Sequence, residues 1–145
     1  MNLWIDADGF PRRQREIAVN AAVRKGMEVM IVADRTIQSG DFPDVHSVTV
    51  ASGDDSSDGY IEAHIAQGDM VLTRDIPAME RFILKGAFCV DHQGNVYTRE
   101  NIRERLSLRD FMDEYREILG KQPRSKHSPK KEVQGFAQTL AALLQ

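Results

Sequence analysis

The chain has 145 residues, of which 41% are hydrophobic and 28% charged, as in an ordinary globular protein. Its single cysteine, Cys89, excludes an internal disulfide and a cysteine-rich zinc site. Neither a basic leader nor an apolar run of about 18 residues occurs, so we expect a cytoplasmic protein that does not engage a membrane.

Apolar runs alternate with helical patterns along the first 90 residues. In chain order they predict a strand at 2–5, a helix at 11–26, strands at 28–33 and 46–50, a helix at 56–68, a strand at 70–73, a helix at 76–86, a strand at 87–90 and an extended piece at 96–97. This repetition predicts a three-layer α/β fold with a mostly parallel sheet of four or five strands between flanking helices.

Beyond residue 98 the pattern is helical only and forms a helical C-terminal extension. We expect Thr98 to cap a short helix that runs through Arg105, and Ser107 with Asp110 to form the capping box of a second helix. Residues 1–120 would form the α/β domain and residues 121–128 a basic linker. Residues 129–145 would form an amphipathic helix packed on the domain.

Basic residues are concentrated near the end of a chain whose net charge is −3. Residues 1–120 carry 14 lysines and arginines against 21 acids, whereas residues 121–145 carry five basic residues and one acid. Such a tail can bind a polyanion beside a metal cluster, and Lys126, Lys130 and Lys131 would then attract phosphate. The plainer interpretation is a solvated linker before a last helix.

Four aspartates stand where predicted elements meet: Asp6 and Asp8 after the first strand, Asp58 at a helix start and Asp75 after a later strand. Because parallel strands end at the same edge of a sheet, we expect the four side chains to share that edge. Crowded carboxylates repel one another, and Mg²⁺ or Mn²⁺ would relieve the repulsion. We expect Asp6, Asp58 and Asp75 to be metal ligands and Asp8 a further ligand or base. Alternatively, each aspartate only caps a helix.

Three residues near these acids are candidates for contact with a substrate. Thr73 could hold a carboxylate or a water molecule, and Arg74 could clamp a phosphate. Arg12 follows the first acids at a helix start, where it could meet a nucleic-acid backbone. Each residue also has a plainer interpretation, which is a turn former for the threonine and a solvated side chain for the arginines.

The order of the acids resembles the PIN nuclease superfamily, in which an aspartate ends the first strand, an acid lies in a later helix and a T-x-D motif follows a strand, here Thr73-Arg74-Asp75. More closely, the whole chain resembles the YaiI/YqxD family of small bacterial proteins, regarded as PIN-like. This resemblance rests on residues 4–8 with Pro11, 53–58 with Ile61, 68–77, 86–87, Gly94, 97–106 and 109–114. Gly9 and Phe10 stand where members usually carry a small residue and a cysteine, which argues against cysteine chemistry.

The resemblance implies a PIN-like fold and a Mg²⁺- or Mn²⁺-dependent nuclease that hydrolyses phosphodiester bonds of RNA or single-stranded DNA. A second hypothesis is a non-catalytic PIN-like module that binds nucleic acid or protein. A third is a phosphatase of the haloacid dehalogenase type, because Asp6-Ala7-Asp8-Gly9 matches the acid pair of those enzymes. Phe10 and the lack of a lysine motif between the acidic elements oppose this third hypothesis.

Overall fold

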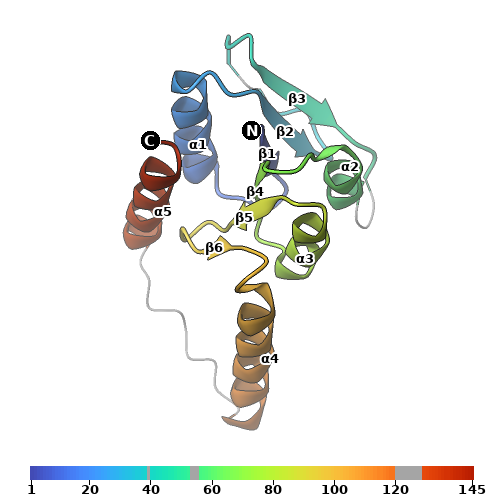
Figure 1. The fold of residues 1–145 in the computed structure, drawn as a ribbon, viewed down its shortest axis with the longest axis vertical. Coiled ribbons are helices and arrows are strands. Elements are labelled where there is room, and N and C mark those ends of the chain that lie inside the picture. The colour runs from blue at the N-terminus through green and yellow to red at the C-terminus, as the bar shows by residue number, and fades with distance from the viewer. Residues whose placement is uncertain (39, 53–55, 120–128) are drawn as a thin grey trace.

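The structure is a computed structural model that describes residues 1–38, 40–52, 56–119 and 129–145 (Figure 1). Its elements in chain order are β1 (Leu3–Asp6), α1 (Arg12–Arg24), β2 (Val29–Ala33), β3 (Val45–Thr49), α2 (Ser56–His64), β4 (Met70–Leu72), α3 (Ile76–Leu84), β5 (Phe88–Val90), β6 (Val96–Tyr97), α4 (Ile102–Leu119) and α5 (Pro129–Leu143). The predicted α/β class is therefore confirmed.

The strands form one sheet in the order β3-β2-β1-β4-β5-β6. All neighbouring pairs are parallel except β5 and β6, which are antiparallel. The described residues thus contain six strands, so the predicted number of four or five is too low. The additional strand, β6, has only two residues and lies where the sequence predicts no more than a short extended piece at 96–97.

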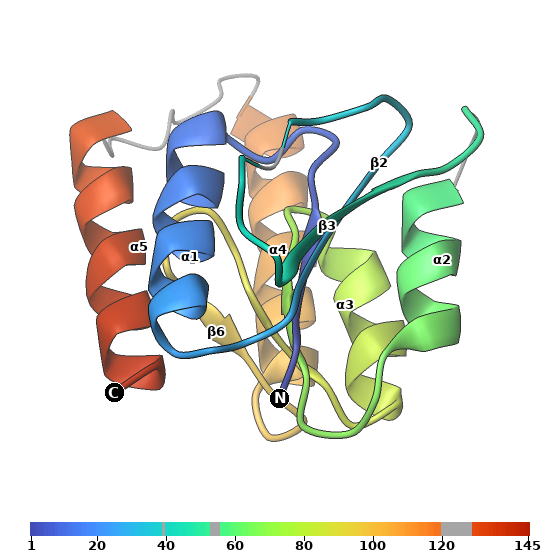
Figure 2. The same ribbon diagram turned by 90° about the horizontal axis from the view of Figure 1, so that it is seen from above.

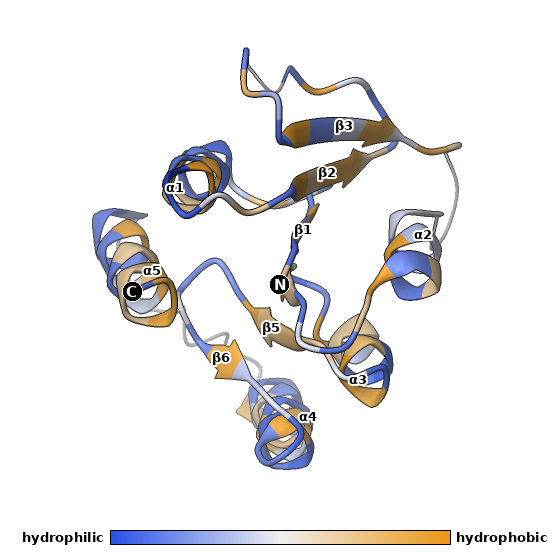
Figure 3. Ribbon diagram, turned by 45° about the horizontal axis from the view of Figure 1, so that its top comes forward, coloured by the Kyte–Doolittle hydropathy of each residue, from blue (hydrophilic) through white to orange (hydrophobic). Residues whose placement is uncertain are grey.

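Helices cover both faces of the sheet and make three layers (Figures 2 and 3). Helices α1 and α5 contribute to the hydrophobic core on one face, which includes Phe10 and Phe136. Helices α2 and α3, with the start of α4, contribute to the core on the other face. All four residues of β1 are buried, as expected for a central parallel strand packed on both sides.

Close backbone packing holds α5 against the turn between β5 and β6. Gly94 has a positive φ of 92°, and a Cβ atom built there would lie 2.5 Å from the carbonyl oxygen of Gly135 in α5. The Thr139 hydroxyl donates a hydrogen bond of 2.7 Å to the Gly94 carbonyl oxygen. A side chain at residue 94 would therefore push α5 away from the sheet.

The region after residue 98 differs from its prediction. Residues 102–119 form one continuous helix, α4, so the predicted break before Ser107 is wrong. This segment contains neither glycine nor proline, and an internal serine costs a helix only a few tenths of a kcal/mol. The capping pattern of Ser107 and Asp110 is therefore overridden by continuous helical hydrogen bonding.

The order of the strands reverses direction between β1 and β4. These strands are parallel neighbours, but α1 follows β1 on one face whereas α3 follows β4 on the other. Ligands of open α/β sheets bind at such a reversal, beyond the carboxyl ends of the strands.

Among the described helices, none is long and apolar enough to cross a membrane.

Candidate functional site

Three predicted carboxyl groups meet at the carboxyl edge of the sheet, beside β1 and β4. Asp6 ends β1, Asp58 lies in the first turn of α2, and Asp75 precedes α3. The carboxyl groups of Asp6 and Asp75 lie close enough to that of Asp58 to change its pKa through hydrogen bonding and charge. Asp75 also caps α3, since its Oδ1 accepts a hydrogen bond of 3.1 Å from the backbone N–H of Ala78. Asp75 therefore caps a helix, as the alternative interpretation expects. It also meets the other two acids.

Thr73 connects two of these acids. Its buried hydroxyl donates a hydrogen bond of 3.1 Å to Asp6 Oδ2 and accepts one of 3.0 Å from the backbone N–H of Asp75. A hydroxyl group can make both bonds at once because it is both donor and acceptor. Thr73 therefore fixes the position of Asp6 relative to the start of α3, which is more than a turn former does.

The electrostatics of the cluster favour a bound proton. Burial, followed by the hydrogen bonds with Asp75 and Asp6, raises the pKa of Asp58 from 3.8 to about 8. Burial also raises the pKa of Asp6, against the lowering effect of its hydrogen bonds with Asp58 and Thr73. Adjacent buried carboxyl groups cannot all ionise without a compensating cation. The cluster therefore retains a proton at neutral pH.

Asp8 is held in a different way from the other three acids. Its Oδ2 accepts hydrogen bonds from the backbone N–H of Asp34 at 3.1 Å and the Ser57 hydroxyl at 3.0 Å, and Oδ1 lies 3.1 Å from Arg35 Nη1. The charge of Asp8 still contributes to the raised pKa of Asp6. Asp8 thus ties the ends of β1 and β2 to the start of α2 at the margin of the cluster.

The structure adds basic groups that the sequence did not indicate. Arg81 in α3 places Nη2 3.6 Å from Asp58 Oδ2 and Nε 2.9 Å from Glu62 Oε1. Arg35 is the ion-pair partner of Asp8. Both contacts join segments that are far apart in the chain, and no local motif marks them. Only the packing of α2 against α3, and of β2 beside β1, brings these groups together.

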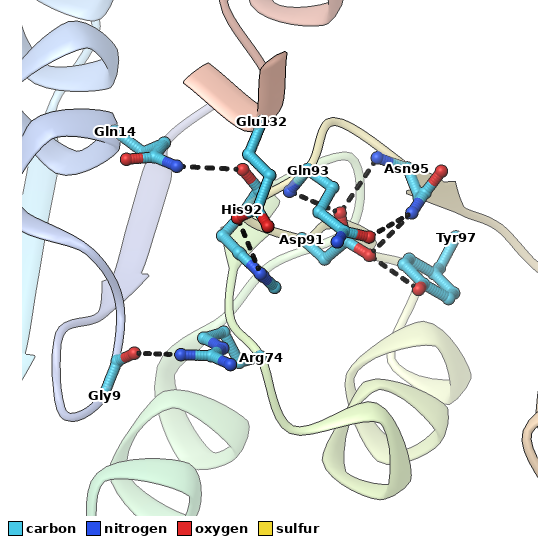
Figure 4. Close-up of polar contacts among 9 residues, drawn as sticks. All are labelled: Gly9, Gln14, Arg74, Asp91, His92, Gln93, Asn95, Tyr97 and Glu132. Atoms are coloured by element: carbon cyan, nitrogen blue, oxygen red, sulfur yellow. Dashed lines mark hydrogen bonds and ion pairs between the residues drawn. The ribbon is translucent and has the colours of Figure 1, made fainter. Parts of the chain in front are cut away.

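The predicted arginines lie near the cluster but make other contacts. Arg74 donates a hydrogen bond of 3.2 Å from Nη1 to the Gly9 carbonyl oxygen, which links the segment after β4 to the segment after β1 (Figure 4). Arg12 pairs with Glu16 on its own helix at 2.9 Å and is largely exposed. Arg74 is therefore positioned by the fold, whereas Arg12 has the solvated character of its plainer interpretation.

Two of the three predicted lysines lie at the start of α5. Lys130 and Lys131 lie in its first turn, and Lys126 lies outside the described residues. That turn reaches the carboxyl end of β5, where Glu132 Oε2 is 3.4 Å from His92 Nε2 (Figure 4). Burial, followed by the charge of Arg74, lowers the pKa of His92. The start of α5 therefore lies at the same edge of the sheet as the acids.

A metal ion would need some change in this arrangement. Among the described residues, no group of three or more histidine, cysteine, aspartate and glutamate side chains is arranged to hold a metal ion. The only cysteine is buried in β5, and burial raises the pKa of its thiol far above the usual range. Cysteine is therefore no donor here, and the carboxylate oxygens of Asp6, Asp58 and Asp75 are the candidate metal donors that lie closest together.

The fold and site define an α/β protein whose carboxyl groups gather where the order of the parallel strands reverses. The family model described as "Uncharacterized BCR, YaiI/YqxD family" matches residues 4–145, and the chain belongs to this family. A UPF0178 protein of Syntrophobacter fumaroxidans is 39% identical over 97% of this chain and 92% of its own length. Another from Halorhodospira halophila is 44% identical over 80% of this chain and 77% of its own. No solved structure gives a significant match.

Proposed function

We propose that this protein is a Mg²⁺- or Mn²⁺-dependent nuclease of PIN-like fold that hydrolyses phosphodiester bonds of RNA or single-stranded DNA. The observation that carries the proposal is the convergence of Asp6, Asp58 and Asp75 at the carboxyl edge of the sheet. These three acids come from separate elements. Their mutual repulsion weakens the fold unless a proton or a cation compensates the negative charge. Acids whose pKa values are raised by burial and by neighbouring acids are candidates for functional groups.

The donor chemistry of the cluster suits a hard cation. Carboxylate oxygens are preferred by Mg²⁺ and Mn²⁺, and a cation can take the place of a shared proton. The carboxyl groups now bond to one another, so their side chains must rotate and release that proton before they can surround an ion. Once bound, the cation would supply the positive charge that activates water and stabilises the leaving oxygen.

The remaining residues orient the acids and the substrate. Thr73 holds the Asp6 carboxyl group, and the N-terminus of α3 holds that of Asp75. Arg81 offsets part of the negative charge beside Asp58. Arg74, held on the Gly9 carbonyl, and the lysines at the start of α5 are placed to attract the phosphates of a strand.

Replacement of Asp6 by asparagine tests the proposal directly. Asp6→Asn should lower Mn²⁺-dependent cleavage of single-stranded RNA by about a thousandfold, because it removes a charged oxygen ligand. Its melting temperature without metal should equal or exceed that of the wild type, since like-charge repulsion falls. Cleavage assays and thermal unfolding in chelator give the two values. An Asp6→Asn variant that cleaves like the wild type would exclude Asp6 as a ligand.

The second candidate is a non-catalytic module that binds nucleic acid or protein. It is favoured by the lack of an assembled metal site among the described residues. Calorimetry with Mn²⁺ separates the candidates, because an inactive scaffold need not bind the ion at micromolar affinity. The phosphatase hypothesis requires Asp6 as an accessible nucleophile, yet Asp6 is buried. A phosphomonoester tested beside single-stranded RNA would show which bond, if either, is cleaved.

A further inference from the structure

A groove of about 540 Å³ lies between α1 and the segment that joins β2 to β3. Three arginines, Arg12, Arg15 and Arg35, are among the residues that line it. Its apolar lining includes the buried side chain of Val19 and the ring of Phe42, which is 38% exposed. The volume falls within the range of about 300–1,000 Å³ that is usual for small-ligand sites.

The charges in this groove are incompletely compensated. Arg12 pairs with Glu16, and Arg35 pairs with Asp8. Arg15 is half-buried and forms no side-chain hydrogen bond or ion pair with any described residue. Burial, followed by the positive charge of Arg12, lowers the pKa of Arg15, whereas the negative charge of Glu16 acts in the opposite direction. Glu16 also lines the groove, but no carboxylate of the described residues lies within ion-pair distance of the Arg15 guanidinium.

We propose that this arginine groove binds a phosphate group and the adjoining base of a single-stranded nucleic acid. Arg15 would take the phosphate, because a guanidinium offers two parallel N–H donors to phosphate oxygens. The base would lie on Phe42, since a stacked base gains about 1–3 kcal/mol on an aromatic ring. Arg35 lines the groove, and its Nη1 lies 3.1 Å from Oδ1 of Asp8, so this ion pair connects the groove to the margin of the acid cluster. This inference takes its class of ligand from the proposed nuclease.

The test measures binding without cleavage. A fluorescent single-stranded octanucleotide is titrated in chelator against the wild type, Arg15→Gln and the matched control Arg13→Gln. Arg13 carries the same charge on the same helix but is exposed and does not line the groove. Arg15→Gln should weaken binding by about tenfold and lower the salt slope by about one, whereas Arg13→Gln should change it less than about twofold. Phe42→Ala should weaken binding independently of salt.

Equal losses in the two arginine variants, or no binding by the wild type, would overturn the groove as a site. Adenosine monophosphate that competes as tightly as the strand would show that the ligand is a free nucleotide, and would overturn the strand. Because the titration contains no metal, it is separate from the nuclease assay. If the wild type binds the strand through Arg15 but shows no Mn²⁺-dependent cleavage, the proposed nuclease is refuted and the groove is not.

A second, independent observation concerns α4, which extends away from the sheet (Figure 1). Five large apolar side chains on this helix are exposed, and four of them recur at helical spacing: Leu108 by 58%, Phe111 by 60%, Tyr115 by 45% and Ile118 by 81%. Their spacing of three, four and three residues places them on one face. Contiguous exposed apolar side chains of this kind mark an interaction surface.

The charges along α4 identify a partner. Residues 102–109 carry three arginines and one glutamate, whereas residues 110–119 carry four acids and one arginine. Two copies of this helix packed antiparallel would place each basic half beside an acidic half. We infer that a second copy of this chain covers the exposed face of α4, in an antiparallel helix pair.

The oligomeric state tests this inference. Light scattering at micromolar concentration should give twice the monomer mass of 16.4 kDa. Ile118→Glu should give a monomer, and the control Leu84→Glu should not, although Leu84 on α3 is 71% exposed. A mixture of Leu108→Cys and Ile118→Cys proteins should form a mixed disulfide, because these positions face each other only in the antiparallel pair. A monomeric wild type, or disulfides only between identical variants, would overturn the inference.

Discussion

Two pairs of buried aspartates show how similar burial can have opposite consequences. Asp69 and Asp91 are 3% and 6% exposed, and Asp58 and Asp6 are 6% and 7% exposed. The first pair is surrounded by hydrogen-bond donors, whereas Asp58 bonds to other carboxyl groups. Burial alone therefore does not mark a functional acid. The kind of partner does, because donors stabilise a buried carboxylate and other acids destabilise it.

Asp69 shows the structural role most clearly. Its Oδ1 accepts a hydrogen bond of 2.9 Å from the backbone N–H of Asn2. Its Oδ2 accepts bonds from Trp4 Nε1 at 3.0 Å and from the backbone N–H of Ala66 at 2.9 Å. The carboxylate thus joins the start of β1 to the segment before β4. A family resemblance that includes residue 69 can arise from this scaffold role alone.

The largest effect on stability is expected for Asp69→Asn. In either orientation the amide turns its NH₂ group toward at least one backbone or indole N–H, so a buried donor loses its acceptor. The free energy of unfolding should fall by about 2–3 kcal/mol. Urea unfolding at neutral pH measures the change. A variant with the wild-type midpoint would show that the donors find other acceptors, and the contrast with Asp58 would fail.

Asp58→Asn should act in the opposite direction. The folded-state pKa of about 8 lies above the ordinary 3.8, so the folded protein binds a proton that the unfolded chain releases. Wild-type stability therefore falls as the pH rises from about 4 to about 8. Asparagine cannot ionise, so the variant avoids this loss and should exceed the wild type by about 1–2 kcal/mol at pH 8, with little difference near pH 4. Urea unfolding at both pH values measures the difference. If the variant is less stable than the wild type at pH 8, Asp58 is a structural acid like Asp69.

The α/β class and the meeting of acids at one edge could be predicted because both follow from local patterns. Asp6 and Asp75 follow apolar runs, and parallel strands place such positions side by side. Asp58 could be placed there because α2 starts at the same edge. The donor shell of Asp69 could not be predicted, since its partners Asn2 and Trp4 are more than 60 residues away.

Two further differences have the same physical origin. Asp8 was grouped with the other acids, but its bonds to Arg35 and Ser57 depend on the packing of β2 and α2 around β1. The unbroken course of α4 past Ser107 depends on helix propagation, which local capping patterns do not measure. Sequence patterns thus located the edge and most of its acids, whereas the partner of each acid required the fold.

The smallest effect is expected for Thr73→Val, which keeps the side-chain shape and removes the hydroxyl between Asp6 and Asp75. The Asp6 carboxyl group and the backbone N–H of Asp75 each lose a partner, so stability should fall by about 1 kcal/mol. The hydrogen bond from Thr73 lowers the pKa of Asp6, so its loss should raise that pKa further. If the ionised acid is needed, the rising limb of cleavage against pH should move to higher pH. Thr73→Ser should restore the wild-type profile, because it returns the hydroxyl. An unchanged profile in Thr73→Val, with wild-type kcat, would show that Thr73 supports the fold without positioning Asp6.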